Sequence, residues 1–248
     1  MPVRRDLVGE EPLSIRVQGN PYSVVMRTPG DEIAHVAGFC LGEGIIDTPE
    51  DYTSIAYCDG ADTNVVTVTL KPGRREKIAD LLDRRNFISQ TSCGLCGKEL
   101  VEDLYQLIQP VDKNTKIDPR KALDCLGALD QHQPLRNQTR AAHAALLYDS
   151  EYKLLASAED VGRHNALDKA VGIVFLKNEL NKVAFLVLSS RISYELVQKA
   201  ARARIPLILA VSRPTALAVE LASQLNVTLA SQAEPSGLYI FCGPERLI

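Results

Sequence analysis

The sequence contains no long apolar run. None of its hydrophobic stretches approaches the roughly 20 residues that a membrane-spanning helix needs, and no apolar signal-peptide core follows the first six residues. Six cysteines stand at irregular spacing in the 248 residues. Without a secretory signal, that usage predicts reduced thiols. We therefore expect a cytoplasmic protein that does not associate with membranes.

The chain also lacks an excess of positive charge, internal repeats and low-complexity segments. Its formal net charge is −3, whereas a general nucleic-acid binder is normally basic overall. Hydrophobic residues make up 46% and charged residues 24% of the chain, which is typical of a globular protein that folds around an apolar core. We therefore expect no nucleic-acid partner.

A second ligand pair for zinc is missing as well. Cys93 and Cys96 form a CxxC pair, but the sequence holds no second CxxC and no HxxxH, and a structural zinc site of this kind needs another pair. We expect no metal. Zinc remains an alternative, because other thiols are available to complete a site together with four histidines: Cys40, Cys58, Cys125 and Cys242. A thioredoxin-like switch and a purely structural role are further alternatives, although thioredoxin-like domains place the motif early, soon after a first strand.

Cys93 and Cys96 stand at the predicted start of a helix. After Gly97, the apolar residues at positions 100, 101, 104, 107 and 108 keep helical spacing. Unpaired N–H groups and the positive end of the helix dipole favour a thiolate at such a place, and Lys98 adds a positive charge. The motif therefore predicts sulfur chemistry.

The length predicts two domains. A chain of 248 residues exceeds the usual domain of about 100 to 150 residues, and the polar stretch 110–119 is the expected linker. We predict a smaller α+β domain that carries the CxxC pair at 1–114, and an α/β domain at 115–248. Predicted strands of the smaller domain lie at 13–17 and 22–26, which form a hairpin, and at 52–57 and 64–70; predicted helices lie at 31–42 and 75–84.

Strands and helices alternate in the second domain. Predicted strands lie at 142–148, 153–158, 184–188, 207–211, 227–230 and 237–242, and predicted helices at 119–129, 166–177, 194–203 and 216–224. Repeated strand–helix units with near-continuous apolar strands predict a three-layer α/β sandwich with a largely parallel sheet.

Three strand-to-helix turns of this domain are polar and basic. They lie at 159–165, 189–193 and 212–215, and each holds an arginine. In an open α/β sheet, ligands bind at the carboxyl ends of the strands, where helix N-termini present N–H groups to anions. Three guanidinium groups at one sheet edge would suit a pyrophosphate. The candidate anion-binding residues are Gly162, Arg163, His164, Asn165, Ser189, Arg191, Ser212 and Arg213.

Each of these turns also has a simpler interpretation. Ser and Thr cap helices in many proteins, and Glu159 and Asp160 beside Arg163 and His164 could form a surface salt-bridge cluster. We expect Asn165 to cap one helix, with Asp168 three residues later. Pro214 is expected at the first position of another helix.

Two motifs identify a resemblance to a known family. They are TSCGLCGK at 91–98 and EDVGRHNALDK at 159–169. Shorter matches extend over nearly the whole chain: EPL at 11–13, MRTPGD at 26–31, GEGII at 42–46, RNF at 85–87, SSR at 189–191 and VSRPT at 211–215. Together they resemble the FdhD/NarQ family, the formate dehydrogenase accessory sulfurtransferases, for which the DVGRHNALDK motif is specific.

The resemblance implies a sulfur carrier needed for formate dehydrogenase activity. Family members accept persulfide sulfur from a cysteine desulfurase and pass it to the molybdenum cofactor, in its bis(guanine dinucleotide) form, before that cofactor is inserted into the dehydrogenase. The cofactor is then bound cargo, and no permanent cofactor is implied. The resemblance also implies a cytidine-deaminase-like fold for the larger domain, the catalytic subunit of formate dehydrogenase as a partner, and a homodimer, which is also the commonest oligomer.

The resemblance further implies roles for individual residues. Cys93 would carry the persulfide, and Cys96 would act as a second carrier or release the sulfur as sulfide. The C-terminal strand is implicated in cofactor binding, through Leu238, Tyr239, Ile240, Phe241, Cys242 and Gly243. Where family members usually have Thr-Gly-Gly, this chain has Thr139-Arg140-Ala141. The alternative function is a non-catalytic module that binds a cofactor or a partner and has redox-active or zinc-binding thiols.

Overall fold

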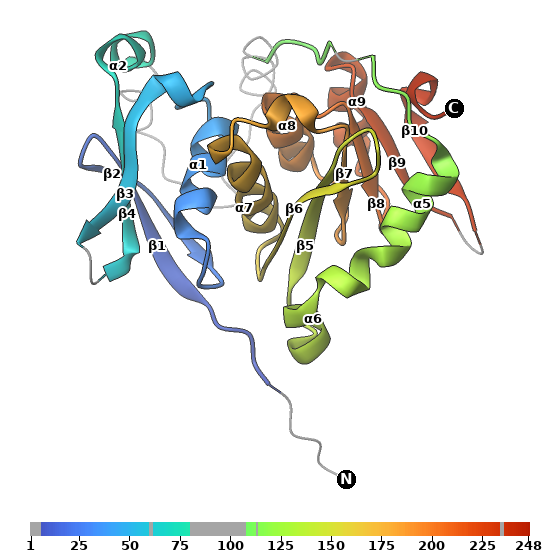
Figure 1. Ribbon diagram of the computed structural model, residues 1–248, viewed down its shortest axis with the longest axis horizontal. Helices are drawn as coiled ribbons and strands as arrows, with labels where there is room; N and C mark the ends of the chain where they lie inside the picture. The colour runs from blue at the N-terminus through green and yellow to red at the C-terminus, as the bar shows by residue number, and fades with distance from the viewer. Residues whose placement is uncertain (1–5, 60–61, 80–107, 113, 234–235) are drawn as a thin grey trace.

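Two β-sheets flank a central pair of helices (Figure 1). The computed structural model describes residues 6–59, 62–79, 108–112, 114–233 and 236–248. Its strands are β1 (Glu11–Val17), β2 (Asn20–Arg27), β3 (Tyr52–Asp59), β4 (Asp62–Leu70), β5 (His143–Tyr148), β6 (Leu154–Asp160), β7 (Phe185–Leu188), β8 (Leu207–Ala210), β9 (Thr228–Gln232) and β10 (Leu238–Cys242). Its α-helices are α1 (Glu32–Gly42), α2 (Pro72–Lys77), α5 (Pro119–Gly127), α6 (Pro134–Thr139), α7 (Arg163–Leu176), α8 (Tyr194–Arg202) and α9 (Ala216–Gln224).

The first sheet has four strands in the order β2-β1-β4-β3. β1 and β2 form the predicted antiparallel hairpin, because Gln18 and Gly19 both adopt the positive φ that a tight hairpin turn requires. Buried side chains alternate along β1, at Leu13, Ile15 and Val17. One face of this sheet therefore packs into the core, as alternation in a half-buried strand predicts.

The second sheet has six strands in the order β10-β9-β8-β7-β5-β6. The pairs β7–β8 and β8–β9 are parallel, whereas β5–β6, β5–β7 and β9–β10 are antiparallel. The prediction of a largely parallel sheet is therefore wrong. β5 and β6 are joined by the short turn 149–153, in which the Asp149 carboxylate accepts the N–H groups of Glu151 and Lys153. Such a turn permits only antiparallel pairing.

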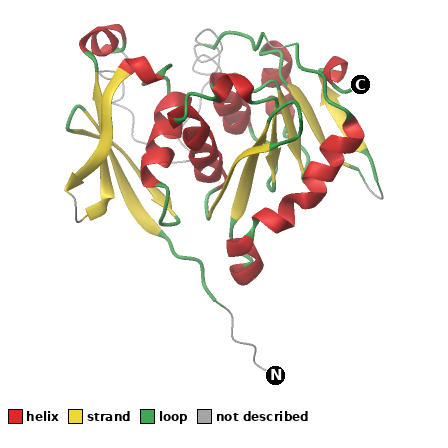
Figure 2. Cartoon of the chain, in the orientation of Figure 1, coloured by secondary structure: helices red, strands yellow, loops and turns green. Residues whose placement is uncertain are grey.

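Helices cover both faces of the six-stranded sheet (Figure 2). Leu167 of α7 and Leu221 of α9 belong to the core on one face, and Leu126 of α5 belongs to the core on the other. Successive residues of β7, Leu186 and Val187, enter different cores because strand side chains alternate between faces. The three-layer α/β sandwich is confirmed. In the part of the chain that the structure describes, no helix is long and apolar enough to cross a membrane.

The helices α1 and α7 approach each other at backbone distance. A Cβ atom added to Gly38 would lie 1.9 Å from the Asp168 carbonyl oxygen, and one added to Gly172 would lie 1.7 Å from the Ala34 carbonyl oxygen. Only glycine fits at both positions, because real Cβ atoms do not come within 3.0 Å of a neighbour. The contact joins the two sheets through one continuous core that includes Val36 of α1.

The predicted linker at 110–119 packs against the second half of the chain. Val111 and Ile117 are fully buried. The Val111 N–H group donates to the Leu225 carbonyl, and Ile117 forms a parallel bridge with Leu247. The division between 114 and 115 stays a prediction. The helix predicted at 75–84 corresponds to α2, which begins earlier, at Pro72, a residue that suits a first helical turn, and ends at Lys77. Residues 80–84 of the predicted range lie outside the described residues.

Replacing Gly172 by alanine should destabilise the protein. The new methyl group would overlap the Ala34 carbonyl, so α1 and α7 must separate, at a cost of about 1–3 kcal/mol for overpacking. Each kcal/mol corresponds to a melting-temperature loss of about 2–4 °C in a chain of this size. Gly127→Ala is the control, because nothing lies within 4 Å of its added Cβ. Equal melting temperatures for the two variants would contradict the packing argument.

Candidate functional site

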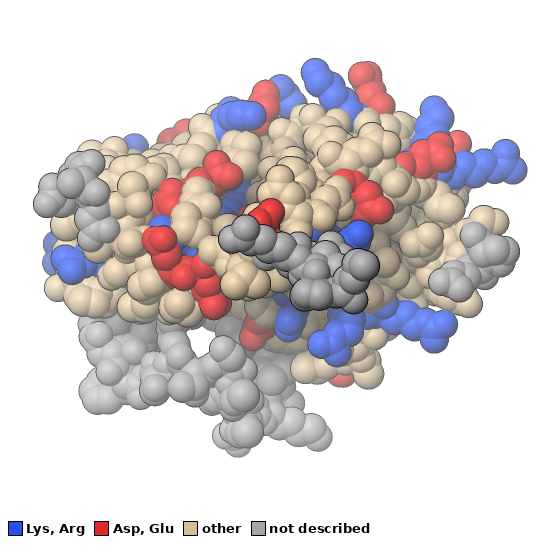
Figure 3. Space-filling model, turned by 90° about the horizontal axis from the view of Figure 1, so that it is seen from below, with Lys and Arg blue, Asp and Glu red and all other residues tan. Residues whose placement is uncertain are grey.

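The three basic turns lie at one edge of the six-stranded sheet. β6, β7 and β8 all end there, because β6 and β7 both run antiparallel to β5 while β8 runs parallel to β7. The second and third turns touch directly: Ile192 bridges Pro214, and the Thr215 N–H group donates to the Ile192 carbonyl at 3.0 Å. Figure 3 views the molecule from below, toward this edge, and shows basic side chains below and to the right of its centre. We call this region the strand-end edge.

The first turn differs from its predicted form. α7 begins at Arg163 with Gly162 as its N-cap, so Asn165 lies inside the helix and the predicted cap is wrong. The reason is the carboxylate of Asp160, whose Oδ1 accepts the Gly162 N–H at 2.9 Å and starts the helix earlier. The Asn165 amide instead donates to Asp160 Oδ1 at 3.0 Å and to the Met26 carbonyl at 2.7 Å.

Asp160 is a buried anchor and not part of a surface cluster. Its side chain is fully buried and lies 2.8 Å from the Lys169 ammonium, which is also buried. The second carboxylate oxygen accepts the Thr28 N–H at 3.0 Å, and Lys169 donates to the Thr28 carbonyl at 2.7 Å. The Val161 N–H group donates a further hydrogen bond to the Thr28 hydroxyl oxygen. These bonds fix the end of β2 against the start of α7, and so hold the first turn in place.

Glu159, beside Asp160, also has a structural role. Its carboxylate accepts the backbone N–H groups of Leu135 and Arg136 at 2.8 and 2.9 Å, at the start of α6. These N–H groups have no partner within the helix, so Glu159 satisfies them from outside. The surface salt-bridge interpretation is therefore wrong for both acidic residues.

His164 faces the strand-end edge and pairs with α8. Its Nε2 atom lies 2.9 Å from Glu195 Oε2 and 3.3 Å from the Ser193 hydroxyl. The hydrogen bond from His164 holds the pKa of Glu195 below its usual range, although burial opposes the shift. The pair joins the first turns of α7 and α8.

Arg191 and Arg213 extend from the second and third turns into solvent. The Arg213 guanidinium lies 5.0 Å from the centre of the Tyr239 ring, a cation–π contact. Within the described ranges, neither arginine, nor Arg163, pairs with a carboxylate. Three guanidinium groups are thus left available to an anion.

The hydroxyl groups of Ser189 and Ser190 form hydrogen bonds within the protein. The Ser189 hydroxyl accepts the Ala144 N–H at 2.8 Å, and the Ser190 hydroxyl donates to the Arg191 carbonyl. α9 begins at Ala216, with the Thr215 hydroxyl as its cap. The prediction that Pro214 opens this helix is therefore wrong, because Thr215 supplies the capping oxygen one residue later. Ser212 is half-buried at the same edge.

The segment from Leu238 to Gly243 only partly reaches the strand-end edge. β10 runs antiparallel to β9, so Leu238 pairs with Gln232 at this edge whereas Cys242 pairs with Leu229 toward the opposite one. Tyr239 and Ile240 are each 45% exposed, and Phe241 is half-buried between them and the far end. Gly243 lies against Thr228, whose hydroxyl would sit 2.6 Å from an added Cβ. Of this segment, Tyr239 makes the contact with the basic turns.

Cys93 and Cys96 lie outside the described residues, as does most of the helix predicted to follow them. Among the residues that the structure does describe, no group of three or more His, Cys, Asp and Glu side chains is arranged to hold a metal ion.

A buried ion pair lies behind the site. The Lys199 ammonium is 2.9 Å from both carboxylate oxygens of Asp168, and the two side chains are 12% and 4% exposed. Burial raises the pKa of Asp168 to about 6, although Lys199 opposes the shift. Lys199 also lies 5.2 Å from the centre of the Phe39 ring, so the pair fastens α7 and α8 to α1. The sequence does not reveal this ion pair, because a lysine on an amphipathic helix such as α8 is normally exposed to solvent.

Fold and site together define a mixed α/β protein whose strand ends present unpaired arginines. Residues 8–248 match the FdhD/NarQ family, and the chain belongs to that family. It is 39% identical to the sulfur carrier protein FdhD of Streptomyces coelicolor, over 97% of this chain and 88% of the relative. The protein of the same name from Mycobacterium tuberculosis is 37% identical over 97% of this chain and 91% of the relative.

A solved structure shares the fold. It is the crystal structure of a proposed formate dehydrogenase accessory protein from Desulfotalea psychrophila, with a TM-score of 0.77 at 24% identity, and the match covers 98% of this chain and 91% of that one. The likeness to cytidine deaminases stays a prediction.

Arg140 has an unusual backbone conformation. This residue ends α6 in the left-handed region, with a φ of 61°. Glycine adopts that conformation without strain, whereas a residue with a Cβ pays roughly 1 kcal/mol. Arg140 therefore holds a strained backbone conformation at the end of α6.

Lys199→Met should destabilise the protein more at pH 8 than at pH 5. At pH 8 it leaves the Asp168 carboxylate buried without a counter-ion, which costs about 3–5 kcal/mol. The folded-state pKa of Asp168 is already raised to about 6 and rises further without the lysine. The variant therefore retains stability at low pH, where Asp168 is protonated and uncharged. It loses that stability as the pH rises through the pKa of Asp168.

Urea unfolding at both pH values measures the difference. Lys177→Met, at an exposed lysine just after α7, is the control and should cost little at either pH. An equal loss for Lys199→Met at pH 5 and pH 8 would show that Asp168 does not take up the proton.

Proposed function

We propose that this protein is a sulfur carrier that serves formate dehydrogenase. Membership of the FdhD/NarQ family supports the proposal, and so do the names of relatives at 37–39% identity, which are called sulfur carrier proteins. The structural observation that carries it is the meeting of three basic turns at one sheet edge, where no described carboxylate neutralises their arginines. That edge suits the pyrophosphate of a dinucleotide cargo.

The proposed chemistry begins at Cys93. Its thiolate attacks the outer sulfur of a persulfide on a cysteine desulfurase, a new S–S bond forms, and the donor's cysteine leaves as a thiolate. Cys93 then carries one additional sulfur atom. In the release step the Cys96 thiolate attacks Cys93, the two cysteines form a disulfide, and the outer sulfur leaves as hydrosulfide. The cysteine pair thus supplies the two electrons that convert sulfane sulfur to sulfide.

The proposed acceptor is the molybdenum bis(guanine dinucleotide) cofactor, bound as cargo before its insertion into the dehydrogenase. Arg163, Arg191 and Arg213 would hold its phosphates, and Tyr239 would line the same edge. In this proposal the partners are a cysteine desulfurase, the catalytic subunit of formate dehydrogenase and a second copy of the chain, and the protein works in the cytoplasm.

Cys93→Ala should abolish sulfur uptake. Incubation of the purified protein with a cysteine desulfurase and cysteine, followed by intact-mass spectrometry, should show a gain of one sulfur atom that reduction removes. The control is Cys58→Ala, which removes an exposed thiol of β3 and should leave the gain unchanged. Full sulfur uptake by Cys93→Ala would reject the carrier assignment, and no uptake by the unaltered protein would favour a binding module with redox or zinc-binding thiols.

Arg163→Ala, Arg191→Ala and Arg213→Ala should each weaken binding of GDP. The expected loss is on the order of 1–3 kcal/mol for each charge-assisted contact removed. Isothermal titration calorimetry with GDP measures it. Unchanged affinity in all three variants would place the anion site away from the strand-end edge.

A further inference from the structure

A second group of cations lies at the β5–β6 end of the strand-end edge. His143 is the first residue of β5 and is half-buried. Arg163 begins α7, and Arg136 lies in α6. His143 pairs with Asp160 of β6, three residues before Arg163, and Arg136 Nη1 donates to the carbonyl of Ala142, the residue before His143, at 3.5 Å. The three residues therefore lie at the same end of the sheet. Sequence reasoning assigned no role to His143 or Arg136.

Two polar atoms of this group lack partners. Arg163 Nε and His143 Nδ1 are both buried, and neither makes a hydrogen bond to any residue that the structure describes. Buried polar atoms are almost always hydrogen-bonded in native proteins. The nearby carboxylates are engaged elsewhere: Glu159 accepts the α6 N–H groups and Glu195 binds His164. Positive charge gathered around buried polar atoms without partners favours the binding of an anion.

We propose that His143, Arg163 and Arg136 form a phosphate subsite, and that His143 takes up a proton from solvent when the phosphate binds. The inference rests on the proposed function, because the phosphate would belong to the dinucleotide cargo. Arg163 presents Nε–H to an oxygen, and His143 becomes an imidazolium that donates from Nδ1 to another. Arg136 adds charge at the rim.

The surroundings of His143 explain the proton uptake. Burial, and after it the neighbouring charges of Arg163 and Arg136, lower the pKa of His143 below its usual value, so the neutral ring predominates in the free protein at pH 7. The pyrophosphate of a dinucleotide carries two negative charges, one on each phosphate, and its binding between these groups reverses the sign of the local field. The imidazolium then becomes stable at a pH where the free protein holds neutral imidazole.

This subsite is separate from the contacts made by Arg191 and Arg213. His143 lies on β5, whereas Arg213 follows β8, and β7 lies between these two strands. At about 4.8 Å per strand, the two groups are roughly 10 Å apart along the edge. A bis(guanine dinucleotide) cargo carries two pyrophosphate groups, so one of them can occupy each end of the edge.

Calorimetric titration with inorganic pyrophosphate and with GDP tests the subsite. Titrations at pH 6.5 in two buffers of different ionisation enthalpy give the number of protons taken up. His143→Asn keeps a polar side chain that cannot become charged. The unaltered protein should take up more protons than His143→Asn with the same ligand, and subtracting one from the other removes the ligand's own protonation. Arg163→Gln should bind either ligand about tenfold more weakly.

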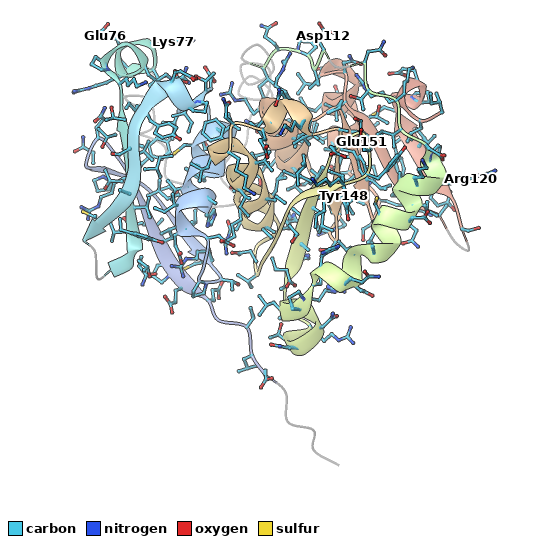
Figure 4. All side chains as sticks on the ribbon, in the orientation of Figure 1. Glu76, Lys77, Asp112, Arg120, Tyr148 and Glu151 are labelled. Carbon is cyan, nitrogen blue, oxygen red and sulfur yellow. The ribbon has the colours of Figure 1, made fainter. Side chains whose placement is uncertain are left out.

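The pH dependence separates binding from a structural role. At pH 6 His143→Asn should bind about tenfold more weakly than the unaltered protein, and at pH 8, where the imidazole is mostly neutral, the two should agree within about threefold. Arg120→Ala is the control. Arg120 lies in α5, at the end farthest from α6 (Figure 4), and its removal should change neither affinity nor proton uptake.

Three results would overturn the inference. They are the absence of pyrophosphate and GDP binding, equal proton uptake by the unaltered protein and His143→Asn, and unchanged affinity in Arg163→Gln. None of them depends on sulfur uptake at Cys93, which mass spectrometry reports separately. A protein that acquires sulfur but shows no proton difference would keep the proposed function and lose this subsite.

Discussion

The backbone contact between α1 and α7 is the constraint on which the rest of the structure depends. Because Gly38 and Gly172 carry no side chain, each helix brings its backbone against a carbonyl of the other. The approach places Thr28, just before α1, against Asp160, just before α7. The position of the first basic turn therefore follows from how closely two glycines let the sheets come together.

The EDVGRHNALDK motif at 159–169 contributes both to the fold and to the strand-end edge. Helical periodicity separates the residues that have each role. Asn165, Asp168, Lys169 and Gly172 follow the spacing i, i+3, i+4, i+7, so they share one face of α7. That face carries the bonds to β2, the ion pair with α8 and the close approach to α1. Arg163 and His164 precede this face in the first turn and stay available at the edge. The high density of polar residues in the motif thus has two separate physical causes.

The strands and the common edge could be predicted from the sequence, because they depend on local patterns. Alternation in β1 and continuous apolar runs in β7 and β8 specify burial, and strand–helix turns at 189–193 and 212–215 must meet at one edge of their sheet. The start of α7 could not be predicted, since it depends on a buried carboxylate whose partner Thr28 is 132 residues away.

Other parts of the site could not be predicted from the sequence, for related reasons. Lys199 lies on a strongly amphipathic helix, where a lysine is normally solvated, and only the packing of α1 over α8 buries it against Asp168. His143 opens a strand and resembles a core residue until the turn from β6 brings Arg163 beside it. The direction of β10 decides which residues of the C-terminal segment reach the edge, and pairing direction is not encoded in an apolar run.

Backbone hydrogen bonds from residues 246–248 hold the segment around Ile117, which is synthesised much earlier. The Ile117 N–H group donates to the Arg246 carbonyl, and the Ile248 N–H group donates to the Ile117 carbonyl. During synthesis on the ribosome, Ile117 emerges more than a hundred residues before its partners exist. The approach to α5 therefore cannot reach its final state until residues 246–248 have been synthesised.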